Sequence, residues 1–210
     1  MDSYINFALL SVFIPTFFFV SITPGMCMTL SMTMGMTIGV KRALHFMWGE
    51  LIGVALVAVS SVIGIAAIML KNPSLFTVFK LMGGGYLLYL GIQMWLSKGK
   101  MAMGEANSHL QESSAFGLAS QGFITAIANP KGWAFFIALL PPFISQDLPL
   151  VPQVSVLIMM ILLLEFICLL IYASGGKKLN TLLQQRANVK TMNRISGSLM
   201  MGIAVWLVAA

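Results

Sequence analysis

The chain has 210 residues, of which 59% are hydrophobic and 9% are charged, and its mean hydropathy is +0.93. Soluble domains carry about 25% charged residues, so this composition excludes a soluble globular protein and indicates an integral membrane protein. The net charge of +6 does not indicate a nucleic-acid partner, because the basic residues lie in short segments between apolar runs, where membrane topology accounts for them.

Six apolar segments approach the roughly 20 residues that a helix needs to cross a bilayer. The predicted spans are residues 4–30, 43–70, 75–96, 116–140, 151–174 and 195–210. The N-terminal apolar run is too long for a cleaved signal peptide, so we interpret it as the first span. The sequence therefore predicts an all-α integral membrane protein with six transmembrane helices and a polar linker at 97–114.

The first predicted span contains two interruptions, one at Pro15 and one at Thr23, Pro24 and Gly25. Proline removes a backbone donor and clashes with the preceding turn, so we expect the helix to kink or break at both places. The N-terminus of a half-helix attracts anionic groups such as a carboxylate. We therefore predict an unwound hinge at Pro24 and Gly25 that faces a substrate; a purely structural kink is the alternative.

The fourth predicted span is interrupted by Asn129, Pro130 and Lys131. A lysine within hydrocarbon costs several kcal/mol unless it faces a partner or a watery cavity, and backbone groups freed by a break must be satisfied by protein or solvent. These residues predict a substrate site, in which Lys131 binds a substrate carboxylate or pairs with an acid. The alternative, that Lys131 snorkels to the interface, is difficult at about fifteen residues into the span.

Two acidic residues lie within predicted spans. Glu165 is flanked by the uncharged runs 148–164 and 166–176. A buried carboxyl group favours its neutral form unless a cation is close, so Glu165 is predicted to carry a proton or to pair with Lys131. A satisfied structural polar residue is the alternative. Glu50 is a second candidate for proton coupling, but it lies within two turns of Arg42 and His45 and could pair with them locally.

We expect no metal site and no cofactor. His45 and His109 supply no ligand set, and Cys27 and Cys168 lie in separate apolar segments, where small buried thiols are more common than a disulfide.

Four glycines, in two pairs whose members are four residues apart, are predicted to let helices approach each other closely. They are Gly35, Gly39, Gly49 and Gly53.

The two halves of the chain, 1–96 and 115–210, resemble each other. The segment LGIQMWL at 90–96 matches MGIAVWL at 201–207, and Pro24 in the first span corresponds to Pro130 in the fourth. Each half has three predicted spans, and an odd number inverts the second copy relative to the first. Paired interruptions in two inverted three-helix repeats point to the central site of a transporter.

The basic residues are distributed unevenly between the predicted loops. One side has Lys41, Arg42, Lys98, Lys100, Lys177, Lys178, Arg186, Lys190 and Arg194, and the other has Lys71 and Lys80. By the positive-inside rule the first side faces the cytoplasm, so the linker at 97–114 is cytoplasmic and both termini lie outside.

These motifs resemble those of the LysE/RhtB family of bacterial amino-acid exporters. The matching residues are Thr23, Pro24 and Gly25, the segment GGGYLLYLGIQ at 83–93, Asn129, Pro130 and Lys131 followed by LLPPF, and NRISGSL at 193–199. Together they extend over nearly the whole chain. The family usually has Pro-Gly-Pro followed by Asn or Asp, whereas Met26 and Cys27 follow Gly25 here, which leaves the substrate open.

The resemblance implies export of amino acids or close derivatives, driven by the proton gradient. It further implies a multi-pass protein of the bacterial inner membrane with periplasmic termini, and it allows a homodimer. The broken first and fourth helices would hold the substrate near the bilayer midplane and give alternating access. The predicted substrate contacts are Thr23, Pro24, Gly25, Met26, Asn129, Pro130 and Lys131, and the predicted proton-coupling residues are Glu165 and Glu50.

Two other function classes are alternatives to amino-acid export. An exporter of divalent cations on the same fold would need several carboxylates around one site. An enzyme embedded in the membrane would need a nucleophile with a base, or a cluster of acids and histidines at depth, and the sequence offers neither.

Overall fold

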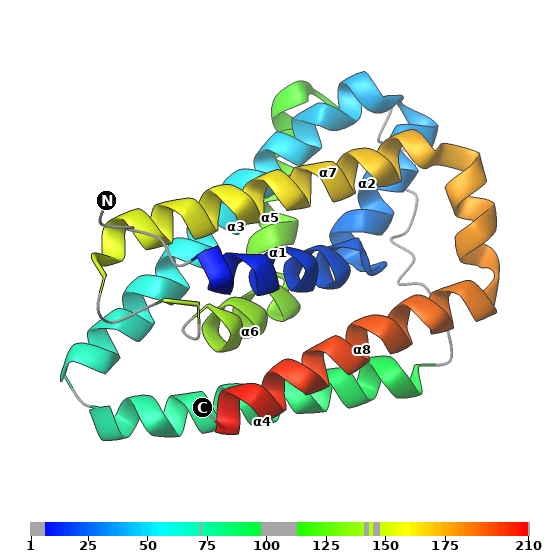
Figure 1. The fold of residues 1–210 in the computed structure, drawn as a ribbon. Helices are drawn as coiled ribbons and strands as arrows, with labels where there is room; N and C mark the ends of the chain where they lie inside the picture. Colours follow the sequence, from blue (N-terminus) through cyan, green and yellow to red (C-terminus); the bar gives the residue numbers. More distant parts are fainter. Residues whose placement is uncertain (1–6, 72, 98–112, 141–142, 145–147, 210) are drawn as a thin grey trace.

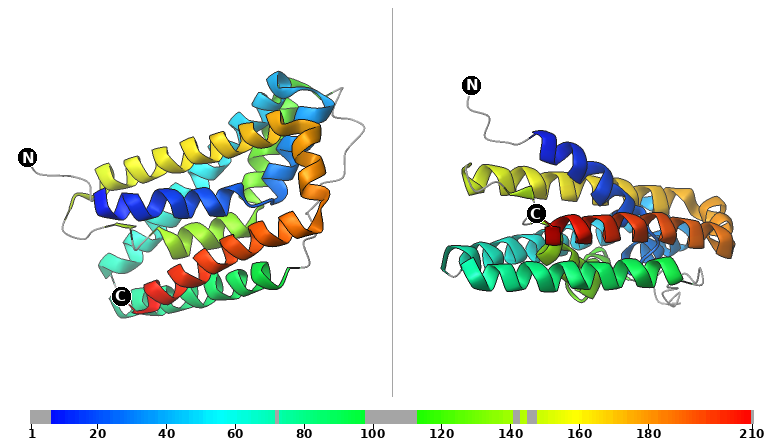
Figure 2. Two further views of the ribbon diagram at one scale, coloured as in Figure 1. Left: turned by 45° about the vertical axis from the view of Figure 1, so that its right-hand side comes forward. Right: turned by 60° about the horizontal axis from the view of Figure 1, so that its bottom comes forward.

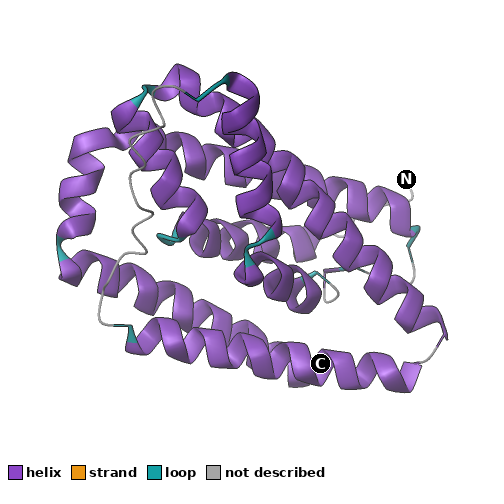
Figure 3. Ribbon diagram, turned by 180° about the vertical axis from the view of Figure 1, so that it is seen from behind, coloured by secondary structure: helices purple, strands orange, loops and turns teal. Residues whose placement is uncertain are grey.

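The computed structural model describes residues 7–71, 73–97, 113–140, 143–144 and 148–209. These residues form α-helices and no strand (Figures 1 and 3), as the sequence predicted. The helices are α1 (Phe7–Ile22), α2 (Met26–Thr37), α3 (Val40–Lys71), α4 (Pro73–Leu96), α5 (Ala115–Ile127), α6 (Pro130–Leu139), α7 (Leu150–Gln184) and α8 (Arg186–Ala209).

The helices of the two halves of the chain pack against each other. Helix α3 contacts α5 and α6, whereas α7 contacts α1 and α2, and α3 and α7 also touch. Helices α4 and α8 lie side by side along their length and form one edge of the molecule (Figure 1). Each long helix, α3 or α7, thus packs on the pair of short helices from the other half.

Glycines bring several of these backbones into contact. A Cβ atom on Gly49 of α3 would lie 1.8 Å from the carbonyl oxygen of Ala119 in α5, and one on Gly35 of α2 would lie 2.2 Å from that of Ala173 in α7. A Cβ on Gly53 would lie 2.7 Å from the side chain of Ala126. The predicted close approach is therefore confirmed for these three glycines.

The prediction is wrong for Gly39, which lies between α2 and α3. No described atom would lie within 4 Å of a Cβ there, and the residue has a φ of +81°. Gly39 ends α2 in the left-handed conformation that glycine adopts without steric cost, so it turns the chain and does not pack helices.

The prediction of a break at Pro15 is also wrong, because α1 continues through it from Phe7 to Ile22. A single proline inside a membrane helix is tolerated when neighbouring groups satisfy the freed carbonyl. Two boundaries differ as well: α7 continues past 174 to Gln184, with non-helical torsion angles at Gly176, and α8 begins at Arg186.

By length and composition, two helical segments of the described chain could cross a membrane, Val40–Gly64 and Leu150–Gly176. Leu10–Ile22 and Met26–Thr37 would make a third span if this pair, bent by 60°, is counted as one. The described residues thus contain two or three candidate spans, as expected of a membrane protein, and six spans stay a prediction.

Five basic residues lie at one end of the molecule. The start of α1 and the end of α8 lie at one end, whereas the turn between α2 and α3 and the segment joining α7 to α8 lie at the other (Figure 2). This second end carries Lys41 and Arg42 from the first turn, with Lys178, Arg186 and Lys190 from the other segment.

The contact of Gly49 with Ala119 predicts a stability difference between two substitutions in α3. We expect Gly49→Ala to destabilise the protein by about 1–3 kcal/mol, because the added methyl group would overlap backbone atoms of α5. Gly64→Ala is the matched control, since no described atom lies within 4 Å of its Cβ position. Thermal unfolding of the purified variants measures the difference, and equal unfolding temperatures would contradict the described packing.

Candidate functional site

The first helix break lies between Ile22, where α1 ends, and Met26, where α2 begins. Gly25 precedes α2 in an extended conformation and provides no side-chain cap. The carbonyl oxygen of Ile22 accepts a hydrogen bond of 2.8 Å from the hydroxyl group of Tyr172 in α7. That of Gly25 accepts bonds from the amide and hydroxyl groups of Thr29, at 2.9 and 2.8 Å. The carbonyls of Ile22 and Gly25, on either side of this break, are therefore paired within the protein.

Thr23 connects the first break to α8 through side-chain contacts. Its side chain is buried, and its hydroxyl group contacts that of Ser196. Both hydroxyl groups lie within hydrogen-bond distance of the carbonyl oxygen of Phe19, at 2.8 Å for Thr23 and 2.9 Å for Ser196. Thr23 is thus a structural contact of the break as well as a predicted site residue.

The second break is shorter in sequence than the first, because only Ala128 and Asn129 separate α5 from α6. Pro130 is the first residue of α6, a position where a helix does not need the missing N–H group. The indole N–H of Trp133 donates to the carbonyl oxygen of Ile127 at 2.8 Å and so satisfies a group at the end of α5. The helix breaks here, as the sequence predicted, and Pro130 starts a new helix.

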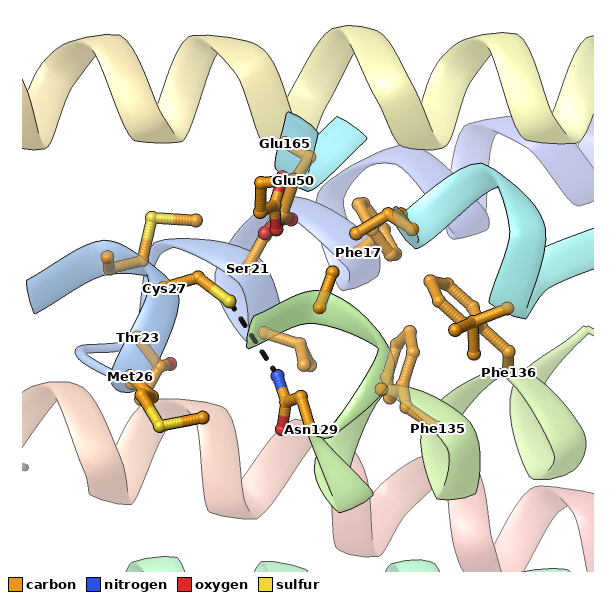
Figure 4. A pocket seen from close by; sticks show the side chains of 17 residues that line it. Phe17, Ser21, Thr23, Met26, Cys27, Glu50, Asn129, Phe135, Phe136 and Glu165 are labelled. Atoms are coloured by element: carbon orange, nitrogen blue, oxygen red, sulfur yellow. Dashed lines mark hydrogen bonds between the residues drawn. The ribbon is translucent and has the colours of Figure 1, made fainter. Parts of the chain in front are cut away.

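Both breaks open onto one cavity of about 100 Å³ (Figure 4). Thr23, Gly25 and Met26 line it from the first break, and Asn129 and Gly132 from the second. The amide nitrogen of Asn129 lies 4.0 Å from the sulfur of Cys27, close enough for a weak hydrogen bond across the cavity. The remaining lining residues are Phe17, Val20, Ser21, Cys27, Met28, Glu50, Val54, Val57, Ala126, Phe135, Phe136 and Glu165.

The two predicted proton-coupling residues meet in this cavity. Figure 4 shows the carboxyl groups of Glu50, from α3, and Glu165, from α7, beside each other. The hydroxyl group of Ser21 donates a hydrogen bond to Glu165. Glu50 is 0% exposed, and neither of its oxygens makes a hydrogen bond of normal geometry with a described residue. The site therefore combines a pair of buried acids with polar groups from both breaks.

The alternative that Glu50 pairs locally with Arg42 and His45 is wrong. The guanidinium group of Arg42 donates to the carbonyl oxygen of Ser113 at 2.8 Å. A ring nitrogen of the exposed His45 lies 3.1 Å from the carbonyl oxygen of Arg42. Both basic side chains contact backbone carbonyl oxygens, whereas Glu50 lines the cavity.

The other predicted residues lie at different places. Pro24 does not line the cavity between the acids; it lines a second cavity of about 260 Å³ with Gln93 and Asn193. Pro130 begins α6 without lining either of these two cavities. The side chain of Lys131 lies outside the described residues, so its role stays a prediction.

Several residues of the site were not predicted from the sequence. Ser21, Tyr172 and Ser196 are polar residues inside apolar helices, and a search for hydroxyl groups at depth would have marked them. The aromatic wall of Phe17, Phe135 and Phe136 gives no such signal, because phenylalanine is common throughout these helices.

Comparison with known proteins assigns the chain to a family. The family described as LysE type translocator matches residues 18–210, which include both breaks and both acids. The chain belongs to this family. The resemblance stated from the sequence is confirmed, and since members of the LysE family are transporters, the chain is a transporter and not an enzyme.

Relatives of this LysE family member have been named in several bacteria. An uncharacterized membrane protein of Vibrio cholerae is 29% identical over 190 residues, which cover 90% of this chain and 91% of the relative. The homoserine/homoserine lactone efflux protein of Salmonella typhimurium is 25% identical with the same coverage. A leucine efflux protein of Klebsiella pneumoniae is 26% identical over 61% of this chain and 60% of its own length. No solved structure matches the chain.

The hydrogen bond from Tyr172 to Ile22 predicts a second stability difference. We expect Tyr172→Phe to destabilise the protein by about 1–3 kcal/mol, because a buried carbonyl oxygen at the break loses its partner. Tyr86→Phe on the exposed face of α4 serves as the control and should change stability little. Thermal unfolding compares the two, and a control as unstable as Tyr172→Phe would show that the break does not depend on this bond.

Proposed function

We propose that this LysE family protein exports amino acids or close derivatives across the bacterial inner membrane. The observation that carries the proposal is the single cavity at which two helix breaks, about 100 residues apart in sequence, meet two buried carboxyl groups. Relatives over most of the chain are named for efflux of homoserine and its lactone, and another for efflux of leucine. All of these solutes carry an amino group.

Proton antiport is the driving reaction in this proposal. Two carboxyl groups beside each other in a low-dielectric site resist being ionised together, so the pair holds a proton unless another cation enters. Glu165 and Glu50 line the same cavity as the substrate contacts. A proton released by the pair on one side of the membrane and taken up on the other would couple export to the proton gradient.

The substrate would lie between the two breaks. Thr23, Gly25, Met26 and Asn129 line the cavity, and α2 begins beside it without a side-chain cap. The positive end of a half-helix dipole attracts a carboxylate. In this proposal the carboxylate of an amino acid lies near the start of α2 or binds Lys131, while its amino group faces the acids.

Alternating access would arise from two inverted repeats, residues 1–96 and 115–210, joined by the linker 97–114. The packing of α3 on α5 and α6, and of α7 on α1 and α2, supports this division, because each half supplies the same kind of contact to the other. The clustering of basic residues at one end supports a cytoplasmic linker and periplasmic termini. Six spans and a homodimer stay predictions.

A divalent-cation exporter is the second candidate, and the meeting of two carboxyl groups favours it. Hard cations take six or more oxygen ligands, and no three His, Cys, Asp or Glu side chains of the described residues are grouped as a metal site. Binding of Mn²⁺ to the purified protein, lost in Glu50→Gln and in Glu165→Gln, would favour this candidate over the amino-acid exporter.

The proposed activity is tested in cells that express the gene and are fed a panel of dipeptides. Peptide hydrolysis raises the internal concentration of each amino acid, and an exporter should raise its external concentration above that of cells with an empty vector. No external excess of any amino acid or derivative across the panel would contradict the proposal.

The role of Glu165 predicts the effect of one substitution on transport. In proteoliposomes with an imposed pH gradient, we expect Glu165→Gln to reduce gradient-driven transport close to background, because an amide cannot release a proton at this site. Ser155→Ala is the control on the same helix, since its exposed hydroxyl group bonds only the carbonyl oxygen of Val151 at 2.8 Å. Unchanged transport by Glu165→Gln would remove Glu165 from the coupling.

A further inference from the structure

The buried carboxyl group of Glu50 is a candidate binding group for a ligand in the cavity. Its side chain is 0% exposed, it lines the cavity, and neither oxygen makes a hydrogen bond of normal geometry with a described residue. A buried polar group without a partner is costly, and a native protein keeps one where a ligand or proton completes it. The carboxyl group points into the cavity beside Glu165 (Figure 4), so a ligand or proton that completes it would enter from there.

The groups around Glu50 favour a cation as that partner. Glu165 from α7 and Cys27 from α2 are the titratable side chains that face it. Cys168 lies near Glu165, and Ser21 of α1 donates a hydrogen bond to Glu165. On α3 itself, His45 is exposed and directed to the carbonyl of Arg42.

The helices α5 and α6 contribute Ala126, Asn129 and Gly132 to the lining together with two phenylalanines, and no described lining residue is basic. The described part of the lining thus presents acids and uncharged groups, which complements a positive charge.

The wall of the cavity beyond the acids is apolar. The rings of Phe17 and Phe135 are 5.7 Å apart, and those of Phe17 and Phe136 are 6.2 Å apart, measured between centroids. All three rings are buried, and Val54 and Val57 complete this side. Aromatic faces attract cations as well as apolar groups. The chemistry that fits both sides is a small primary amine with a short apolar side chain.

We propose that Glu50 and Glu165 together bind the ammonium group of the transported solute, and that this ammonium group and a proton occupy the pair in turn. The inference rests on the proposed function and names the part of the solute that the acids recognise. The empty pair holds one proton. When R–NH₃⁺ enters, one H⁺ leaves to solvent, so the net charge of the site is unchanged. A free carboxylate on the solute is not needed for this exchange.

The exchange is tested with the purified full-length protein in detergent and three small probes that share a branched carbon chain. These probes are isopentylamine, leucine and 4-methylpentanoate. Thermal unfolding reports binding, and an indicator dye in weak buffer reports protons released. We expect the amine and leucine to stabilise the protein and release protons, and 4-methylpentanoate to do neither. The affinity for the amine should rise with pH, by up to about tenfold per unit where the empty pair is protonated.

The variant Glu50→Gln separates recognition by this carboxyl from binding elsewhere. It should lose both proton release and stabilisation by isopentylamine, while Ser155→Ala keeps both. Four outcomes would each overturn the inference. Three concern the wild-type protein: it binds 4-methylpentanoate in place of the amine, it binds the amine without releasing a proton, or it does not bind the amine. The fourth is wild-type behaviour of Glu50→Gln. The first three outcomes are measured on the wild-type protein, so they test the inference even if Glu50→Gln does not fold.

These outcomes are distinct from those of the export test. A protein that exchanges amine for proton in detergent but exports no amino acid from cells would contradict the proposed function and leave the binding site standing. A protein that exports amino acids but releases no proton on binding the amine would contradict the binding site alone.

Discussion

Backbone groups freed inside a membrane must find partners within the protein, and this constraint shapes the structure around both helix breaks. At the first break the partner of Ile22 is Tyr172, which comes from the other half of the chain. At the second break the partner of Ile127 is Trp133, which lies on the following helix. Because side chains satisfy these carbonyls, the chain can stay unwound at both breaks, and the space between the breaks is available for polar lining groups.

Close packing of the helices brings the two acids to that space. Glycines let α3 approach α5 and let α2 approach α7, so that the helices carrying Glu50 and Glu165 enclose one cavity with the broken pairs. A buried acid facing a second acid is unfavourable for stability alone. Its presence at the meeting point of two helix breaks is the basis of the proposed transport role, since buried titratable groups gather at functional sites.

The sequence predicted the features that depend on local chemistry. Proline and its neighbours located both breaks, and composition gave the helical class. The orientation of Glu50 could not be predicted, because it depends on the rotation of α3 against the helices packed around it. The sequence predicted a break at Pro15 that does not occur, since tertiary contacts decide whether a membrane helix tolerates proline. Gly39 fits the spacing of packing glycines, yet its positive φ assigns it to a turn. The sequence shows the hydroxyl groups of Tyr172 and Ser196 inside apolar helices, but their partners Ile22 and Phe19 lie far away in the sequence, and no local pattern reveals such a pairing.

That the two breaks face each other across one cavity is tested most directly by cross-linking Cys27 to Asn129→Cys, in a Cys168→Ala background with a protease site in the linker 97–114. The side chains of Cys27 and Asn129 lie 4.0 Å apart, so mild oxidation should join the two halves through a disulfide that survives cleavage of the linker and yields to reductant. Ile124→Cys, on the exposed side of α5, is the control and should not react with Cys27. Halves that separate on a gel after oxidation of Asn129→Cys, as they do for Ile124→Cys, would contradict a shared cavity.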